Sequence, residues 1–185
     1  MSHTREDAWN LLTEYTQSES LIKHALAVEA AMRFYARTFG ESEELWGLTG
    51  LLHDFDYERY PNAPDHPLKG LAILEEAGWP EEMRNAIAGH AQYLNVARET
   101  RLARTLFAVD ELCGFITAVA YVRPSRKVAE VEPSSVRKKM KDKAFARSVS
   151  REDILRGVEE MGIPFEEHVA NCVAAMAEVA DSLGL

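Results

Sequence analysis

Apolar residues recur along this chain at the spacing of an α-helix. In the clearest stripe, between residues 18 and 39, each member falls three or four positions after the one before: Leu21, Ala25, Val28, Met32 and Tyr35. Such spacing places these side chains on one face of a helix. No segment shows the sustained alternation and β-branched residues that a half-buried strand requires. The sequence therefore predicts an all-α fold.

Capping residues and helix breakers divide this pattern into separate segments. Gly40 should end the helix just described, and the stretch 55–65, which contains two prolines, should be a loop. A break is also expected at 123–125, where a proline follows a long apolar segment. The expected helices are a short one after Thr4, then about 18–39, 43–54, 67–77, 80–89 and 100–120, a short one near Ser134, one after Ser150, and a last one over about 164–183.

The net charge narrows the class of partner. The chain has 30 Asp and Glu residues against 21 Lys and Arg, a balance of -9, whereas nucleic-acid backbones recruit clustered positive charge. We therefore expect no nucleic acid polymer as a partner, whereas a small phosphorylated substrate needs only a local positive patch or a metal. With 46% hydrophobic and 28% charged residues over 185 positions, the composition is typical of a globular protein with a sizeable core. A homodimer stays an open alternative.

Cysteine usage and hydropathy indicate the compartment. Cys113 and Cys172 are too few and too far apart for a disulfide framework or a thiolate metal site. The first residues contain no apolar segment of a secretory signal. Three charged residues interrupt the longest apolar region, 102–122, which argues against a membrane span. We therefore expect a cytoplasmic protein.

The most telling polar residue is a carboxylate beside an apolar helix face. Asp110 lies four residues after Leu106 and three before Cys113, in the middle of the expected helix 100–120. A buried carboxylate needs a partner or a metal, because an unpaired charge in apolar surroundings is very costly. Gly114 follows one turn later and removes side-chain bulk beside it. Asp110 is therefore a candidate ligand.

Four of the six histidines occupy positions that suit metal ligands. His24 faces the same side as the apolar stripe of its helix, and His53, with Asp54 directly after it, ends another apolar helix. His66 precedes a proline at the start of a helix, and His90 ends a helix. Imidazoles and carboxylates are the usual ligands of borderline divalent metals. At a helix end, both members of the His53-Asp54 pair can turn toward one centre.

Each of these histidines also has a purely structural interpretation, because a lone helical histidine is more often structural or exposed than a ligand. His66 would then be a solvated residue near Asp65, and His90 would be favoured by the dipole of its helix. We interpret His3 and His168 as surface or packing residues. Order and local context together, rather than spacing, favour the metal site.

These residues resemble the HD-domain superfamily. The resemblance rests on His24, the His53-Asp54 pair and Asp110 in this order, and it covers about residues 18–120. The strings Leu-Leu-His-Asp, His-Pro-Leu-Lys-Gly, Asn-Ala-Ile-Ala-Gly-His and Phe-Ala-Val-Asp resemble the branch with extra histidines. That branch includes the bacterial HD-type symmetrical diadenosine-tetraphosphate hydrolases and the cyclic-dinucleotide phosphodiesterases. The resemblance implies a single HD-type helical bundle over 1–185, with a core at about 18–120 and a helical extension at about 121–185.

The resemblance also implies a ligand set for two metal ions. One ion would be held by four residues and a second by two more, with Asp54 bridging the ions and acting with His53 as the catalytic pair. Iron, manganese, cobalt, nickel, magnesium and zinc all remain possible, because sites of histidine and carboxylate do not select one strongly. The implied ligands are His24, His53, Asp54 and Asp110 for the first ion and His66 and His90 for the second.

The activity that these features favour is hydrolysis of a small phosphate ester or nucleotide by a metal-activated water. A di-iron oxygenase of the same superfamily would use the same ligands and is the alternative. A non-catalytic helical protein with a structural metal is a third hypothesis. The sequence after the pair, Phe-Asp-Tyr-Glu-Arg-Tyr, departs from many relatives, and no Gly-Tyr-Pro loop is present, which argues against cyclic di-GMP as the substrate.

Other polar residues are candidates for supporting roles. Lys69, three residues after His66, is a candidate phosphate contact. The basic stretch 123–143 is interpreted mainly as a solvated face, with phosphate binding as the alternative. Three acidic residues could orient the ligands by hydrogen bonding: Asp56, Glu58 and Glu111.

Overall fold

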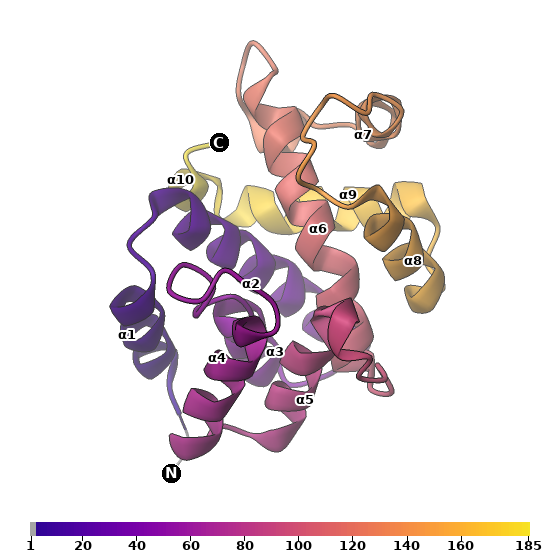
Figure 1. Cartoon of the computed structure of the whole chain (residues 1–185). Helices are drawn as coiled ribbons and strands as arrows, with labels where there is room; N and C mark the ends of the chain where they lie inside the picture. Colours follow the sequence, from indigo (N-terminus) through magenta and orange to yellow (C-terminus); the bar gives the residue numbers. More distant parts are fainter. Residues whose placement is uncertain (1–2) are drawn as a thin grey trace.

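The computed structural model describes residues 3–185, and over this range the chain forms ten α-helices and two short 3-10 helices without a strand (Figure 1). The all-α class is therefore confirmed. The elements in order are α1 (Arg5–Tyr15), α2 (Glu19–Phe39), α3 (Glu43–Leu52), α4 (Asp65–Glu76), α5 (Glu81–His90), η1 (Gln92–Leu94), α6 (Arg101–Tyr121), η2 (Val128–Glu130), α7 (Pro133–Met140), α8 (Arg151–Met161), α9 (Phe165–Glu178) and α10 (Ala180–Leu183).

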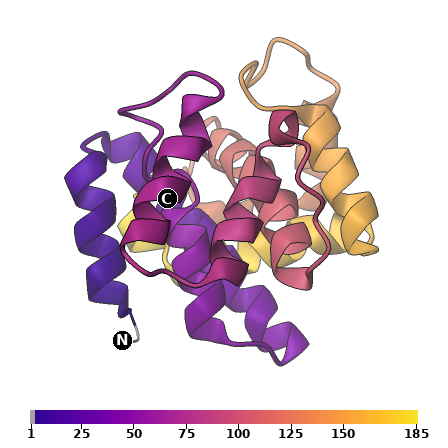
Figure 2. The same ribbon diagram turned by 60° about the horizontal axis from the view of Figure 1, so that its bottom comes forward.

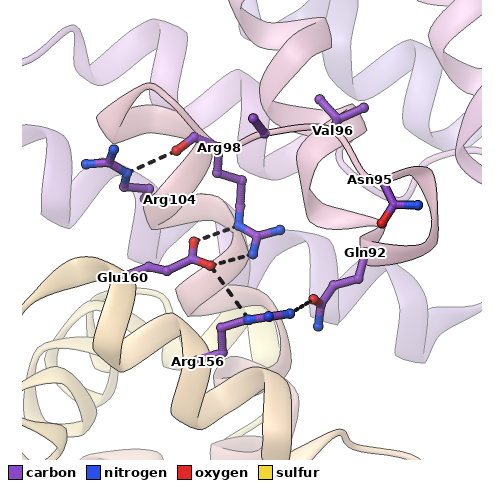
Figure 3. Close-up of a pocket in the computed structure, with 8 residues that line it drawn as sticks. Gln92, Asn95, Val96, Arg98, Arg104, Arg156 and Glu160 are labelled. Carbon is purple, nitrogen blue, oxygen red and sulfur yellow. Dashed lines mark hydrogen bonds and ion pairs between the residues drawn. The ribbon is translucent and has the colours of Figure 1, made fainter.

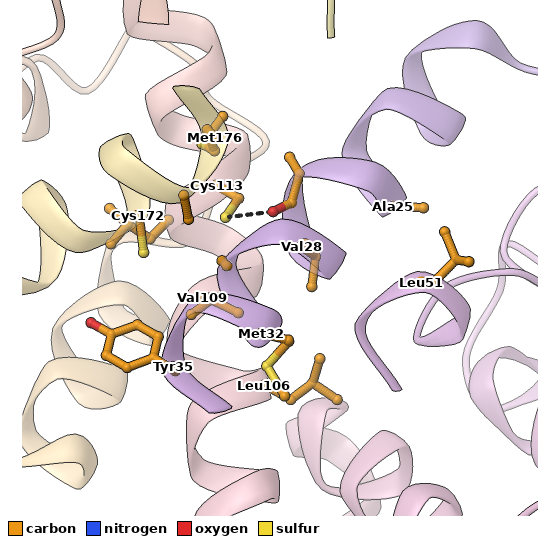
Figure 4. Close-up of a cluster of buried hydrophobic side chains, with 14 of the residues drawn as sticks. Ala25, Val28, Met32, Tyr35, Leu51, Leu106, Val109, Cys113, Cys172 and Met176 are labelled. Atoms are coloured by element: carbon orange, nitrogen blue, oxygen red, sulfur yellow. Dashed lines mark hydrogen bonds between the residues drawn. The ribbon is translucent and has the colours of Figure 1, made fainter. Parts of the chain in front are cut away.

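Two long helices, α2 and α6, form the centre of the molecule. Helix α3 packs along α2, α5 and α8 pack on α6, and α9 contacts both long helices. Their buried apolar side chains form one cluster, with Val28 and Met32 from α2, Leu106 and Val109 from α6, and Met176 from α9 (Figure 4). With the molecule turned, α1 (indigo) and α8 (orange) lie on opposite sides of the magenta helices α4 and α5 (Figure 2).

Local sequence signals set several helix ends. The Thr4 side chain accepts a hydrogen bond from the Asp7 N–H, and the Asp7 carboxylate accepts one from the Thr4 N–H, which makes a capping box at the start of α1. Gly40 ends α2 in the left-handed conformation, with φ at 69°. The Ser42 side chain accepts from the Leu45 N–H at the start of α3.

Two expected boundaries differ from the structure. The prediction of one helix over 164–183 is wrong, because the chain breaks at Val179 (φ -121°, ψ 19°) and continues as α10. After the break α10 contacts α2 and buries Leu183. Helix α4 begins at Asp65 rather than at residue 67, although His66 keeps a non-helical backbone with ψ at 131°.

A close approach of α3 to α2 depends on a glycine. A Cβ atom at Gly50 would lie 2.9 Å from the Met32 Cγ and 2.9 Å from the Val28 carbonyl oxygen. Distances below 3.0 Å are not tolerated at a Cβ, so a larger residue would push the helices apart. The contact brings the end of α3, which His53 and Asp54 follow directly, beside the helix that carries His24.

Two expectations from composition can be compared with the structure. Cys113 and Cys172 are both buried as free thiols. Within residues 3–185, no helix combines the length and the apolar character that crossing a bilayer requires.

Candidate metal centre

The His53-Asp54 pair lies directly after the last turn of α3. The side chain of His53 is completely buried, and its Nδ1 lies 2.8 Å from the Gly50 carbonyl oxygen. A carbonyl oxygen only accepts hydrogen bonds, so Nδ1 carries the proton and Nε2 has a free lone pair when the ring is neutral. This Nε2 lies 3.5 Å from the Asp54 Oδ2 and 3.4 Å from the Asp110 Oδ1. Among the described residues, it is a buried nitrogen without a hydrogen-bond partner.

His24 and Asp110 approach the same point from the two central helices. The His24 Nε2 on α2 lies 3.0 Å from the Asp110 Oδ1 on α6. Each of these residues, together with His53 and Asp54, offers one ligand atom, and these atoms all lie within 4.8 Å of one another. Two imidazole nitrogens and two carboxylates at this spacing form a donor set that suits a divalent metal ion.

Asp54 also belongs to a second group. Its Oδ1 lies 3.2 Å from the His66 Nε2 and 3.1 Å from the His90 Nε2, and ligand atoms of the three residues again lie within 4.8 Å of one another. The His90 Nδ1 donates to the Ile87 carbonyl oxygen, which leaves its Nε2 free to bind in the neutral ring. Thus the two oxygens of Asp54 face different histidine groups: Oδ2 faces His53, and Oδ1 faces His66 and His90.

A buried carboxylate orients His66. Asp56 is 1% exposed, and its Oδ1 accepts a hydrogen bond of 2.8 Å from the His66 Nδ1. Its other oxygen accepts from the Gly70 N–H at 2.9 Å, and a Cβ atom at Gly70 would lie 2.7 Å from the Asp56 Cγ. The absence of a side chain at Gly70 therefore leaves room for the carboxylate, which fixes the His66 ring with Nε2 toward Asp54. Such partners of ligand histidines set the ring orientation and the tautomer.

The other two acidic residues that could orient ligands, Glu58 and Glu111, lie in different places. The Glu58 carboxylate accepts from the Gln17 and Ser18 N–H groups, so it joins the loop to the start of α2 and does not face the histidines. The Glu111 carboxylate accepts from the Ser150 N–H at the start of α8, and it lines a cavity that also contains His24 and Asp110. Burial is the main cause that raises the pKa of Glu111 to about 7, and the nearby charge of Asp110 adds to it.

The carboxylates and the histidines of this centre stabilise each other's charged forms. Burial opposes the charge of Asp54, but His53, His66 and His90 outweigh it and hold the pKa of Asp54 well below its usual range. Burial likewise disfavours a charged His66, yet its hydrogen bonds with Asp54 and Asp56 raise the pKa of His66 to about 9. The nearby carboxylates raise the pKa of His53 and His90 in the same way. A divalent ion that binds here would displace these protons from the imidazoles.

A cavity of about 380 Å³ opens over both groups. His24, His66, His90, Asp54 and Asp110 lie in its wall, and the segment around the start of α8 closes another side with Ser148, Val149 and Asp153. Sequence reasoning gave these three residues no role at the metal centre, because nothing in their local pattern shows that residues 148–153 fold back over it.

Lys69 has a different location. It is exposed on α4 and is not among the residues that line this cavity, so its role as a phosphate contact stays a prediction. His3 stacks on Trp79, with ring centroids 4.0 Å apart, and His168 is fully buried in the core. These two histidines lie outside the two groups of possible metal ligands, as packing residues would.

Fold and site together define an all-α protein with a cluster of histidines and carboxylates that fits divalent metal binding. The family model of the HD domain matches residues 21–114, about half of the chain, and this range contains all six clustered residues. The chain therefore belongs to the HD-domain family, whose members are typically metal-dependent phosphohydrolases. Comparison with curated proteins and with solved structures gave no match.

Proposed function

We propose that the protein is a phosphohydrolase that holds two divalent metal ions and cleaves a small phosphate ester or a nucleotide. The observation that carries the proposal is the position of Asp54, whose two oxygens face two separate histidine groups. A carboxylate shared in this way is the natural bridge of a binuclear site, and pairs of metal ions are common in enzymes that cleave phosphate esters.

The residues present fit the metals that the family implies. The Nε2 of His53 is buried without a hydrogen-bond partner among the described residues, and metal binding would satisfy it. We assign His24, His53, Asp54 and Asp110 to the first ion, and Asp54, His66 and His90 to the second. When bound, divalent ions supply Lewis-acid chemistry, lowering the pKa of water and neutralising charge on phosphoryl oxygens. Iron, manganese, cobalt, nickel, magnesium and zinc are all candidates.

The protein's own residues would prepare the centre and select the size of the substrate. Backbone carbonyls and Asp56 hold the three rings of His53, His66 and His90 in fixed orientations, so little rearrangement is needed on binding. The low pKa of Asp54 keeps this carboxylate ionised at neutral pH. A cavity of about 380 Å³ is of the size that holds a small molecule.

The test is an activity screen of the purified full chain. The protein is loaded separately with each candidate metal and incubated with nucleotides, dinucleoside polyphosphates and sugar phosphates, and phosphate release and oxygen consumption are followed together. We expect phosphate release that requires metal and proceeds without oxygen. An oxygen-dependent product without phosphate release would overturn the proposal and favour the di-iron oxygenase alternative.

A further inference from the structure

A second cavity, of about 550 Å³, has the lining residues shown in Figure 3. The two cavities share Gln92, which lies in the wall of both. Three arginines line the second cavity, Arg98, Arg104 and Arg156, whereas Glu160 is the one carboxylate among its lining residues. We call this cavity the arginine pocket. It is a local excess of positive charge in a chain whose net charge is -9.

One of the three arginines is fixed in a structural role. The Arg98 guanidinium donates to both carboxylate oxygens of Glu160, with its Nε 2.7 Å from Oε2 (Figure 3). It also donates to the Gly89 carbonyl oxygen at 2.8 Å and lies over the Phe107 ring, 3.7 Å from its centroid. Arg98 therefore neutralises Glu160 and joins the loop before α6 to α8.

The charge of the other two arginines is not balanced in this way. The Arg156 Nε reaches Glu160 only at 4.0 Å, and its Nη1 donates to the neutral side-chain carbonyl of Gln92. The Arg104 Nε donates to the backbone carbonyl of Arg98 at 3.0 Å, and within residues 3–185 Arg104 forms no ion pair. Hydrogen bonds from Arg98 lower the pKa of Glu160, and the charges of Arg156 and Arg104 add to this effect. Neither guanidinium group is held by a carboxylate as closely as that of Arg98 is, so both keep donors for an anion.

Gln92 connects the arginine pocket to the metal centre. Its side-chain amide donates to Asp153, which lines the metal cavity, and its carbonyl oxygen accepts from Arg156 in the arginine pocket. The side chain of Gln92 therefore borders both sites. A molecule with one group at the metal centre would extend past Gln92 to place another group in the arginine pocket.

We propose that the arginine pocket binds a second phosphate group of the substrate whose reacting phosphate lies at the metal centre. Planar guanidinium groups bind phosphate oxygens in pairs, which makes arginine well suited to this role. The substrate class is then a small molecule with two separated phosphate-containing groups rather than a simple monophosphate. The proposal rests on the proposed phosphohydrolase function, because that function places the first phosphate.

A binding experiment tests the arginine pocket without any need for activity. Inorganic pyrophosphate is titrated calorimetrically into the full-length Asp54→Asn variant, in which the metal centre is disabled. We expect binding that weakens about tenfold or more when Arg104→Ala and Arg156→Ala are added, because each removes charge-assisted hydrogen bonds. Arg101→Ala is the matched control: this exposed arginine lies on α6 outside the pocket and pairs with Glu41. It should change the affinity less than about twofold.

An activity experiment then tests the substrate class. The ratio of kcat/KM for a hexose or nucleoside bisphosphate to that for the matching monophosphate should fall about tenfold in the Arg104→Ala/Arg156→Ala variant. The single variants Arg104→Gln and Arg156→Gln serve if the double variant does not fold, and each should lower the same ratio. Equal losses for both substrates would show a merely structural role and overturn the proposal.

The two experiments separate the two proposals. Pyrophosphate binding that depends on Arg104 and Arg156 without any phosphatase activity would contradict the proposed function and support an anion site. The opposite result would be phosphatase activity without a role for the arginine pocket. In that case Asp54→Asn would not bind pyrophosphate, or its binding would be unchanged by Arg104→Ala and Arg156→Ala. Either result would contradict the arginine pocket and leave the proposed function standing.

Discussion

The metal centre and the junction of α2, α6 and α9 both contain buried histidines, and their neighbours differ. In the centre, His53 and His90 face carboxylates, which raise the pKa of both rings. At the junction, the His168 Nε2 donates to the Ala108 carbonyl oxygen at 2.9 Å, and its Nδ1 accepts from the Tyr35 hydroxyl at 2.6 Å. Burial there lowers the pKa of His168. Burial alone therefore does not distinguish a functional histidine from a packing one, whereas convergence on a carboxylate does.

The largest effect should follow from removing the carboxylate that both histidine groups share. Asp54→Asn keeps the size of the side chain but removes its charge, so both ions should be lost. We expect kcat/KM to fall by at least about 100-fold, since even losing a residue that only supports a ligand costs about 10- to 100-fold. Metal content per chain, measured by mass spectrometry on the same samples, should fall in parallel.

Asp65→Asn is the control for this change, because Asp65 is an exposed carboxylate next to His66. It should retain the metal content and the activity of the unmodified protein. If Asp54→Asn kept its activity and lost only stability, the third hypothesis, a structural metal in a non-catalytic protein, would be favoured.

A smaller effect should follow from changing the residue that orients one ligand. Asp56→Asn weakens the hydrogen bond to the His66 Nδ1, so the second ion should bind about 10- to 100-fold more weakly while the first keeps its affinity. Metal titration of the stripped protein measures both affinities. Glu58→Gln, two residues further on, affects a carboxylate that accepts from the Gln17 and Ser18 N–H groups, so both affinities should stay unchanged. If Asp56→Asn weakened the binding of both ions equally, the assignment of His66 to one of them would be contradicted.

The smallest effect concerns the pH dependence of folding. The pKa of His168 in the folded protein lies below its ordinary value of 6.5, so its contribution to stability is present above pH 6.5 and is lost as the pH falls below that value. The variant His168→Gln cannot titrate. The difference in the free energy of unfolding between the two proteins should therefore shrink as the pH falls below 6.5. Urea unfolding on both sides of this pH measures it.

In the metal-free protein, the contribution of His66 to stability should change with pH in the opposite direction. Its pKa in the folded state is raised to about 9, so its interactions with Asp54 and Asp56 contribute fully below pH 6.5 and are lost as the pH rises through about 9. The comparison of unmodified protein with His66→Gln, both stripped of metal, should therefore give a difference that shrinks toward high pH. The same direction for His66 and His168 would contradict the distinction between the two regions.

Much of the fold and the main cluster could be predicted from local pattern. His24 and Asp110 lie on long helices whose apolar periodicity fixes the face of each side chain, so the sequence places both toward the interior. The end of α2 at Gly40 and the cap at Thr4 are likewise local. The break at Val179 could not be predicted, because it depends on how α10 packs on α2.

The supporting residues required the three-dimensional structure. Asp56 and Glu58 lie two positions apart in one loop and were equivalent candidates, but only the fold shows that Asp56 turns inward to His66. The arginine pocket is lined by Arg104 from α6 and Arg156 from α8, and no local sequence pattern indicates that these two residues line one cavity. In the same way, the wall formed by residues 148–153 results from long-range packing of the segment after α7.

The central claim, that Asp54 bridges two ions, is tested most directly by anomalous diffraction from crystals of the metal-loaded protein at the absorption edge of the metal. We predict two peaks, one bound by His24, His53 and Asp110 and the other by His66 and His90, with Asp54 in contact with both. A single peak bound by only one histidine group, or metal bound away from Asp54, would contradict the account.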